Sequence, residues 1–185
     1  MLDFSNSKIL IVGDVMLDKY YFGKVDRISP EAPVPIVNIQ KEESRLGGAS
    51  NVANNIVSLG GHSLLCGVIG HDLFGKEIER ISRHKNIDTF LLKTSSPTIT
   101  KARIIGGKQQ IVRVDYEDKS ELNADNKKLF RDTISRILPE YDILVISDYG
   151  KGLISEDLCR YLIKLAHKYD KKVIIDPKGK NWEKY

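Results

Sequence analysis

The 185-residue chain is 41% hydrophobic and 29% charged, a composition that is ordinary for a globular protein and excludes a disordered one. Its 29 basic and 25 acidic residues give a net charge of +4, and the basic residues are scattered, so no nucleic-acid partner is expected. The N-terminus lacks a basic segment followed by a long apolar core, and the apolar runs are too short to cross a bilayer, which predicts a cytoplasmic protein without a membrane partner.

The first half of the chain alternates predicted strands and helices. A β-branched run at residues 8–14 predicts a buried strand, and Gly47 and Gly48 precede an amphipathic helix. A second apolar run at residues 63–70 predicts another strand, which a further amphipathic helix follows. This alternation is typical of an α/β fold with a doubly wound parallel sheet.

Two extended stretches, around residues 20–42 and 98–116, depart from this alternation. The second is predicted to be a hairpin that turns at Gly106 and Gly107. We expect both stretches to form a small sheet that projects from the main one and serves as a lid, an interface or both.

The alternation then resumes with a helix at residues 124–138, a strand at 142–148, a helix opened by Ser155 and a strand at 171–176. No covering helix follows this last strand. We therefore expect residues 1–185 to be the N-terminal portion of a single domain whose C-terminal part is missing.

Acidic residues lie at the ends of three of the predicted strands, where sheets of this class bind ligands: Asp14 with Asp18, Asp148, and Asp176. Because a carboxylate can accept two hydroxyl hydrogen bonds, the pair Asp14 and Asp18 suits a polyhydroxylated ligand such as a sugar. An aspartate that caps a helix or a turn is the alternative.

The two glycines before the first helix belong to neither a GxxxxGK[ST] nor a GxGxxG motif. Gly47 and Gly48 allow a ligand to approach the backbone, and Asn51 can both donate and accept hydrogen bonds. These groups suit hydroxyls as well as phosphate, and a plain tight turn is the alternative.

Four basic residues are candidates for contacts with phosphate. Lys101 and Arg103 share one face of the predicted hairpin, although a solvated strand surface explains them equally well. Lys151 and Lys178 lie in glycine-containing loops, where structural turns compete with phosphate binding. The four histidines have no zinc-ligand spacing, so no metal site is predicted.

Seven segments in this order resemble the heptose 7-phosphate kinases, a branch of the ribokinase-like sugar kinases: GDVMLDKY, RISPEAPVP, GGASNVANNIVSLGG, PTITKARII, QQIVRVDYE, SDYGKG and DPKG. The resemblance runs from Lys8 to Tyr185 and implies a ribokinase-like sheet with a projecting β lid. It also implies phosphorylation of the anomeric hydroxyl of heptose 7-phosphate by ATP with Mg²⁺, on the route to ADP-heptose and lipopolysaccharide. The resemblance further implies that the lid forms a homodimer and that an adenylyltransferase domain can be fused to the kinase domain.

The resemblance assigns roles to the candidate residues. Those expected to bind sugar hydroxyls are Asp18, Gly47, Gly48 and Asn51. Those expected to face the substrate phosphate are Lys101 and Arg103, with Arg27 and Lys151 in reserve. Asp176 and Lys178 are expected on the nucleotide side.

One motif of the family does not occur in the sequence. The GxGD motif, whose aspartate is the catalytic base, is absent from the 185 residues, so no catalytic residue is predicted and the chain is expected to be inactive alone. The alternatives are a kinase of another sugar or sugar phosphate, and a non-catalytic module for sugar binding or dimerisation.

Overall fold

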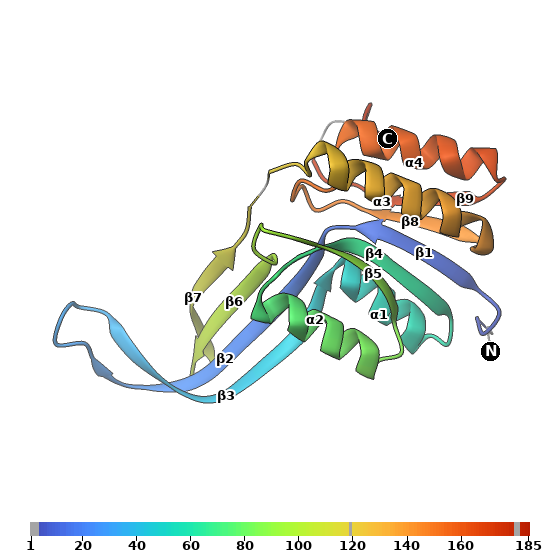
Figure 1. Cartoon of the computed structure of the whole chain (residues 1–185). Helices are drawn as coiled ribbons and strands as arrows, with labels where there is room; N and C mark the ends of the chain where they lie inside the picture. The colour runs from blue at the N-terminus through green and yellow to red at the C-terminus, as the bar shows by residue number, and fades with distance from the viewer. Residues whose placement is uncertain (1–3, 119, 180–181) are drawn as a thin grey trace.

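The computed structural model describes residues 4–118, 120–179 and 182–185, and its centre is a parallel sheet (Figure 1). Every neighbouring pair of strands in this sheet is parallel. The order across the sheet is β5 (Asp88–Thr94), β4 (His62–Gly70), β1 (Lys8–Gly13), β8 (Ile143–Ser147) and β9 (Lys172–Asp176). The doubly wound α/β fold expected from the sequence is thereby confirmed.

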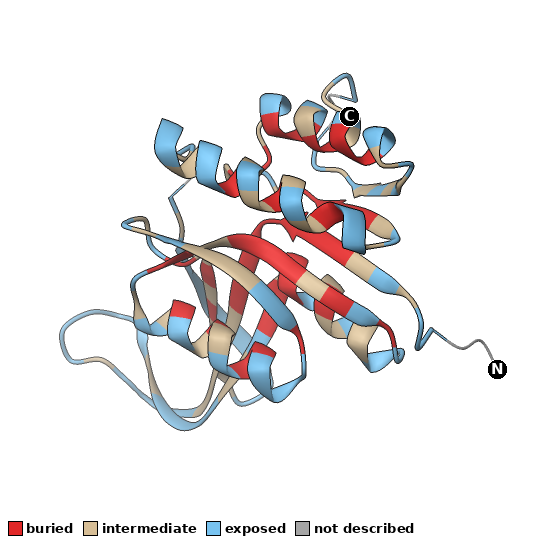
Figure 2. Cartoon of the chain, turned by 45° about the vertical axis from the view of Figure 1, so that its right-hand side comes forward, coloured by how far each residue is buried: buried red, intermediate tan, exposed pale blue. Residues whose placement is uncertain are grey.

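Helices cover both faces of the central sheet (Figure 1). One face carries α1 (Ala49–Ser58) and α2 (Leu73–His84), and the other carries α3 (Ala124–Ile137) and α4 (Glu156–Lys168). Alternate side chains of β1 point to opposite faces of the sheet. Ile11 packs with α1 and α2, while Leu10 and Val12 pack with α3 and α4. Figure 2 shows buried residues along the central strands and on the turns of the helices that face them.

Polar side chains cap α2, α3 and α4 at their N-termini, whereas α1 begins after Gly48 without a side-chain cap. Ser155 accepts a hydrogen bond from the amide of Leu158 over 3.2 Å at the start of α4, as predicted. At its other end, α3 stops at Ile137, one residue earlier than expected, and continues as the 3-10 turn Leu138–Glu140. No helix in the described part of the chain is long and apolar enough to cross a membrane.

A second sheet projects from the carboxyl edge of the first (Figure 1). Its strands, in order, are β3 (Pro35–Gly48), β2 (Val15–Ile28), β6 (Thr100–Gly106) and β7 (Gln109–Tyr116). The predicted hairpin that turns at Gly107 is confirmed, since β6 and β7 pair in antiparallel fashion and this glycine has a φ of 62°.

The strands of the second sheet are longer than the stretch around 20–42 suggested. β2 begins at Val15, directly after Asp14, and β3 runs on to Gly48, with the turn between them at residues 29–34. The extra length arises because β2 is flanked by two partners, β3 on one side and β6 on the other. One consequence is that Asp18 and the Gly47–Gly48 pair lie on neighbouring strands.

Candidate active site

Asp18 and Arg103 form an ion pair between neighbouring strands of the second sheet. Asp18 lies on β2 opposite Lys101 of β6, and Arg103 follows two residues later on the same face of β6. Arg103 Nη1 donates to Asp18 Oδ1 over 2.6 Å, with 22% and 23% of the two side chains exposed. Partial burial opposes the charge of Arg103, but the hydrogen bond and the negative charge of Asp18 raise its pKa.

The pair keeps unused hydrogen-bonding capacity on both sides. A guanidinium has five N–H groups, and Arg103 uses Nη1 for Asp18 and for the carbonyl of Lys101. A carboxylate has about four acceptor sites. Asp18 can therefore accept further hydrogen bonds from hydroxyl groups, and Arg103 can donate further hydrogen bonds to oxygens of an anion.

Tyr20 is a member of this site that sequence reasoning missed. Its ring lies beneath both Arg103 and Arg45, whose guanidinium carbons are 5.1 Å and 4.9 Å from the ring centroid. The position two residues after Asp18 on the same face of β2 is the signal that could have identified it. Tyr20 limits the directions in which Arg103 can turn.

Gly47 and Gly48 both have close neighbours at the position where a side chain would begin. A Cβ atom on Gly47 would sit 2.5 Å from Asp18 Oδ2, so the carboxylate occupies the space that a side chain would need. Gly48 has a φ of 54°, and a Cβ atom there would collide with the carbonyl oxygen of Asp14. The Asp18 carboxylate is thus a structural reason for Gly47, and the positive φ together with the Asp14 carbonyl is a structural reason for Gly48.

The glycine pair leads directly into α1. The amide of Ala49 donates to the carbonyl of Asp14 over 2.9 Å, and the buried Ser50 hydroxyl donates to the carbonyl of Gly47 over 2.6 Å. Asn51 is exposed in the first turn, on the helix that begins beside Asp18. The strand and helix positions of Asp18, Arg103, Gly47, Gly48 and Asn51 therefore bring these residues to the base of the second sheet, beside the start of α1.

Asp14 has a different environment from Asp18, although the sequence groups them. It is 2% exposed, and its Oδ2 accepts hydrogen bonds from the amides of Tyr149 and Lys151 over 2.8 Å and 3.1 Å. Burial raises the pKa of the Asp14 carboxyl, against these two hydrogen bonds, which lower it. In the structure Asp14 thus fixes the backbone of the loop after β8 by accepting hydrogen bonds from its amides. This corresponds to the structural alternative for an aspartate, a turn residue, that the sequence analysis named.

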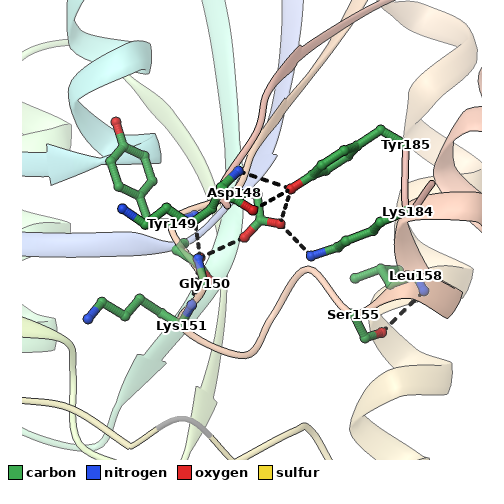
Figure 3. A network of polar contacts seen from close by, with 10 residues as sticks. Asp148, Tyr149, Gly150, Lys151, Ser155, Leu158, Lys184 and Tyr185 are labelled. Atoms are coloured by element: carbon green, nitrogen blue, oxygen red, sulfur yellow. Dashed lines mark hydrogen bonds and ion pairs between the residues drawn. The ribbon is translucent and has the colours of Figure 1, made fainter. Parts of the chain in front are cut away.

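Asp148 ties the same loop to the C-terminal residues of the chain (Figure 3). One of its oxygens accepts from the amide of Gly150 over 2.8 Å, and the other accepts from the Tyr185 hydroxyl over 2.8 Å and pairs with Lys184. The Asp148 side chain is 1% exposed. Lys184 and Tyr185 were not among the predicted residues, because nothing in the sequence links them to a residue so far away.

Lys151 is partly neutralised in this structure. Its ammonium group pairs with Glu117, which follows β7, and only 13% of the lysine side chain is exposed. By contrast, no ion pair of Lys101 is found among the described residues, and it lies across from Asp115 on β7. Of the predicted cations, Lys101 and Arg103 therefore share the face next to Asp18, whereas Lys151 belongs to the neighbouring loop.

Asp176 and Lys178 lie beside the loop after β8. The carbonyl of Asp176 accepts from the amide of Asp148 over 3.0 Å, and the Lys178 amide donates to the Tyr185 hydroxyl over 3.0 Å. Burial, followed by the charge of Asp176 and a hydrogen bond to it, raises the pKa of Tyr149. The two lysine-bearing loops predicted from the sequence are thus adjacent.

Solved structures share this fold. Phosphofructokinase-2 from Escherichia coli matches with a TM-score of 0.68 and 18% identity over 94% of this chain and 55% of its own. Ribokinase from Giardia lamblia matches with a TM-score of 0.66 and 16% identity over 96% of this chain and 57% of its own. The fold is that of the ribokinase-like kinases.

The chain belongs to the pfkB family of carbohydrate kinases, whose family model matches residues 6–185. Among curated relatives, the bifunctional protein HldE of Helicobacter pylori strain P12 is 47% identical over 180 residues, which cover 96% of this chain and 39% of that protein. A D-beta-D-heptose 7-phosphate kinase of Bordetella bronchiseptica is 44% identical, over 98% of this chain and 57% of its own. The chain thus spans about two fifths to three fifths of the length of these relatives.

Proposed function

We propose that this protein phosphorylates the anomeric hydroxyl of D-glycero-β-D-manno-heptose 7-phosphate, giving the 1,7-bisphosphate in the formation of ADP-heptose for lipopolysaccharide. The observation that carries the proposal is the Asp18–Arg103 ion pair, which offers an acceptor for hydroxyl groups beside a donor for phosphate. The names of the relatives at 44% and 47% identity support this choice of substrate. Because ATP is the proposed donor, we place the reaction in the cytoplasm.

In this proposal the residues of the second sheet and of α1 hold the acceptor. Asp18 and Asn51 bind sugar hydroxyls, and the backbone at Gly47 and Gly48 lets the ring approach closely. Lys101 and Arg103 bind the 7-phosphate, where the planar guanidinium matches two phosphate oxygens. The second sheet acts as a lid that excludes water, so that the phosphoryl group passes to the sugar.

The nucleotide is proposed to bind near Asp176 and Lys178. Lys178 lies against Gly150, so its ammonium group and the loop after β8 can face phosphate together. No cluster of three or more His, Cys, Asp or Glu side chains suited to a metal occurs among the described residues. This fits Mg²⁺ carried mainly on nucleotide phosphates, where it neutralises their charge, with few protein ligands.

The catalytic base is proposed to lie outside these 185 residues, which contain no GxGD motif. Residues 1–185 would then form the N-terminal portion of one kinase domain, inactive alone. The Helicobacter relative is named a bifunctional protein, and this chain covers 39% of it. Both facts support a further domain fused to the kinase domain. We propose that this domain is an adenylyltransferase.

A second copy of the chain is proposed as a partner through the second sheet. Several apolar side chains on β2, β3 and β7 are exposed, and the hairpin of β2 and β3 extends away from the central sheet (Figure 1). They include Val25, Ile28, Ile39, Val112 and Val114. An exposed apolar sheet of this kind favours burial against another sheet.

The test of the proposed activity follows ADP release by the full-length protein with ATP, Mg²⁺ and heptose 7-phosphate. We expect turnover that depends on the heptose phosphate, and loss of turnover in Asp18→Asn. Lys164→Ala, at an exposed position of α4, serves as the matched control. Rapid turnover by residues 1–185 alone would contradict the placement of the base, and faster turnover of another sugar would contradict the substrate.

A further inference from the structure

Arg45 lies on β3 directly opposite Asp18 of β2, and it has no role in the function proposed so far. Its side chain is 61% exposed, and its Nη2 donates to Glu43 Oε2 on the same strand over 2.7 Å. A guanidinium has several N–H groups, so this ion pair leaves Arg45 able to donate to another acceptor. Arg45 is therefore a cation beside Asp18 with hydrogen-bonding capacity for a ligand.

One aromatic ring holds Arg45 and Arg103 in place. Strand β2 runs between β3 and β6, and the centroid of the Tyr20 ring on β2 is 4.9 Å from the guanidinium carbon of Arg45 and 5.1 Å from that of Arg103. Phe22 stacks on Tyr20, with ring centroids 6.1 Å apart and planes that differ by 10°, which limits the movement of the Tyr20 ring. The two guanidinium groups are thus positioned by the same ring, one from each strand that flanks β2.

Cations are concentrated around Asp18 on this face of the second sheet. In the pairing register Asp18 has Arg45 directly opposite on β3 and Lys101 directly opposite on β6, and it forms the ion pair with Arg103. Three positively charged residues therefore surround one carboxylate. Because like charges held close together on a sheet repel each other, a bound anion would stabilise this arrangement.

Two further carboxylates of this face are already paired with cations. Glu43 is shared between Arg45 and Lys41, whose Nζ lies 2.6 Å from Glu43 Oε1. Asp115 on β7 pairs with Arg113 over 2.8 Å. The hydroxyl groups of a sugar do not require such an excess of cations, whereas a phosphate monoester, which carries a charge of about −1.5 to −2 at pH 7, is stabilised by it.

We propose that Arg45 is a third phosphate-binding residue of the sugar site, where it sets the preference for a phosphorylated sugar over the unphosphorylated form. Its remaining N–H groups donate to oxygens of the 7-phosphate together with those of Arg103 and Lys101. The Tyr20 ring positions both guanidinium groups before the ligand arrives, so less side-chain freedom is lost on binding. The inference deepens the proposed function and rests on it, since it takes the 7-phosphate as the bound anion.

The test measures binding of heptose 7-phosphate, unphosphorylated heptose and inorganic phosphate to the full-length protein by isothermal titration calorimetry, without nucleotide. Arg45→Gln keeps a long polar side chain and removes the charge. It should weaken the binding of heptose 7-phosphate by about fivefold to tenfold, which is less than the loss of a buried charge would cause, because solvent screens an exposed one. Binding of the unphosphorylated heptose should change by less than about twofold.

Lys41→Gln is the matched control for Arg45→Gln. Lys41 is on the same strand, is 66% exposed and pairs with the same carboxylate, so each variant removes one positive charge and one ion pair with Glu43. Lys41 lies opposite Phe22, farther along the sheet from Asp18. Lys41→Gln should therefore change the binding of heptose 7-phosphate by less than about twofold.

A second pair of variants tests how the two arginines are positioned. Tyr20→Leu removes the ring and should weaken the binding of heptose 7-phosphate by about threefold or more, while the unphosphorylated heptose binds nearly as before. Tyr20→Phe keeps the ring and should restore the preference for the phosphorylated sugar. Equal losses in Tyr20→Leu and Tyr20→Phe would contradict the positioning by the ring.

Three outcomes overturn the inference while leaving the proposed function intact. They are unchanged binding of heptose 7-phosphate in Arg45→Gln, equal weakening of both sugars in this variant, and a loss in Lys41→Gln as large as that in Arg45→Gln. A wild-type protein that does not bind heptose 7-phosphate contradicts the proposed function. Inorganic phosphate then decides the inference, because its binding must weaken in Arg45→Gln but not in Lys41→Gln, and a wild type that binds neither ligand overturns both proposals.

Discussion

Arg103 Nη1 donates a hydrogen bond to Asp18 Oδ1 over 2.6 Å, so the predicted phosphate-binding cation and the predicted sugar-binding carboxylate are joined to each other. The two residues are 85 positions apart in the sequence and meet because β2 and β6 are parallel neighbours. Each orients the other while keeping free hydrogen-bonding capacity. Replacing either residue should therefore change the orientation of the other side chain.

The first prediction concerns recognition of the substrate phosphate. Replacing Lys101 and Arg103 together by Ala should raise KM for heptose 7-phosphate by roughly 100-fold or more, since each of the two lost charge-assisted hydrogen bonds contributes about 1.5–3 kcal/mol. Binding of the unphosphorylated heptose should fall much less. Steady-state kinetics and direct binding measurements check this, with Lys164→Ala as control. Equal losses for the two sugars would argue against the phosphate assignment.

The second prediction separates two kinds of glycine. Gly48→Ala places a Cβ atom at a position of positive φ and against the Asp14 carbonyl, so it should lower the free energy of unfolding by about 3 kcal/mol or more. Gly60→Ala also has a positive φ, of 90°, but nothing lies within 4 Å of its Cβ position, so its loss should be about 1 kcal/mol. Urea unfolding of both variants measures the difference. Similar losses would mean that the collision relaxes at little cost.

Local sequence patterns predicted the helices, strands and turns better than they predicted the side-chain contacts of the candidate site. The apolar run of β1, the glycine pair before α1 and the hairpin at Gly107 each carry their signal within a few residues, and all three are present. The start of β2 at Val15 had no such signal, because its length depends on pairing with β3 and β6. Strand pairing over long sequence separations is a tertiary effect.

The same limit applies to the candidate residues. The sequence could select Asp14 and Asp18 as acidic residues at a strand end, but it could not tell that Asp14 would be buried against amides 135 and 137 positions away. Nor could it show that Lys151 pairs with Glu117, or that Tyr185 meets Asp148. In each case the partner comes from another element, and only packing brings the two together.

The third prediction is a pH dependence of stability from Asp14. Burial raises the pKa of Asp14 above its usual value of 3.8, so the folded state binds the proton more tightly than the unfolded state. This contribution to stability is fully present below that value and is lost as the pH rises through the folded-state pKa. Asp14→Asn removes the titration, so the stability of the variant relative to wild type should improve between pH 4 and pH 7. Urea unfolding at both values tests this, and an unchanged difference would contradict it.

The fourth prediction concerns the hydroxyl of Tyr185. It accepts from the Lys178 amide and donates to Asp148, so Tyr185→Phe should lower the free energy of unfolding by about 1–2 kcal/mol. Hydrogen exchange at the Lys178 amide should become faster as well. Tyr169→Phe is the matched control, because the Tyr169 hydroxyl has no hydrogen bond among the described residues. Unchanged exchange at Lys178 would show that Tyr185 does not hold this loop.

The last prediction addresses the exposed apolar face of the second sheet. Val112 and Val114 lie on one face of β7 and are 44% and 39% exposed, so replacing both by Lys should leave the fold intact. If this face joins two copies, the added charges oppose each other across the interface and the protein should become monomeric. Light scattering coupled to size-exclusion chromatography over a range of concentrations measures the mass. Leu59→Lys, at an exposed apolar position after α1, controls for the general effect of replacing an apolar residue by lysine. A monomeric wild type, or a dimer that survives the double substitution, would rule out this face as the interface.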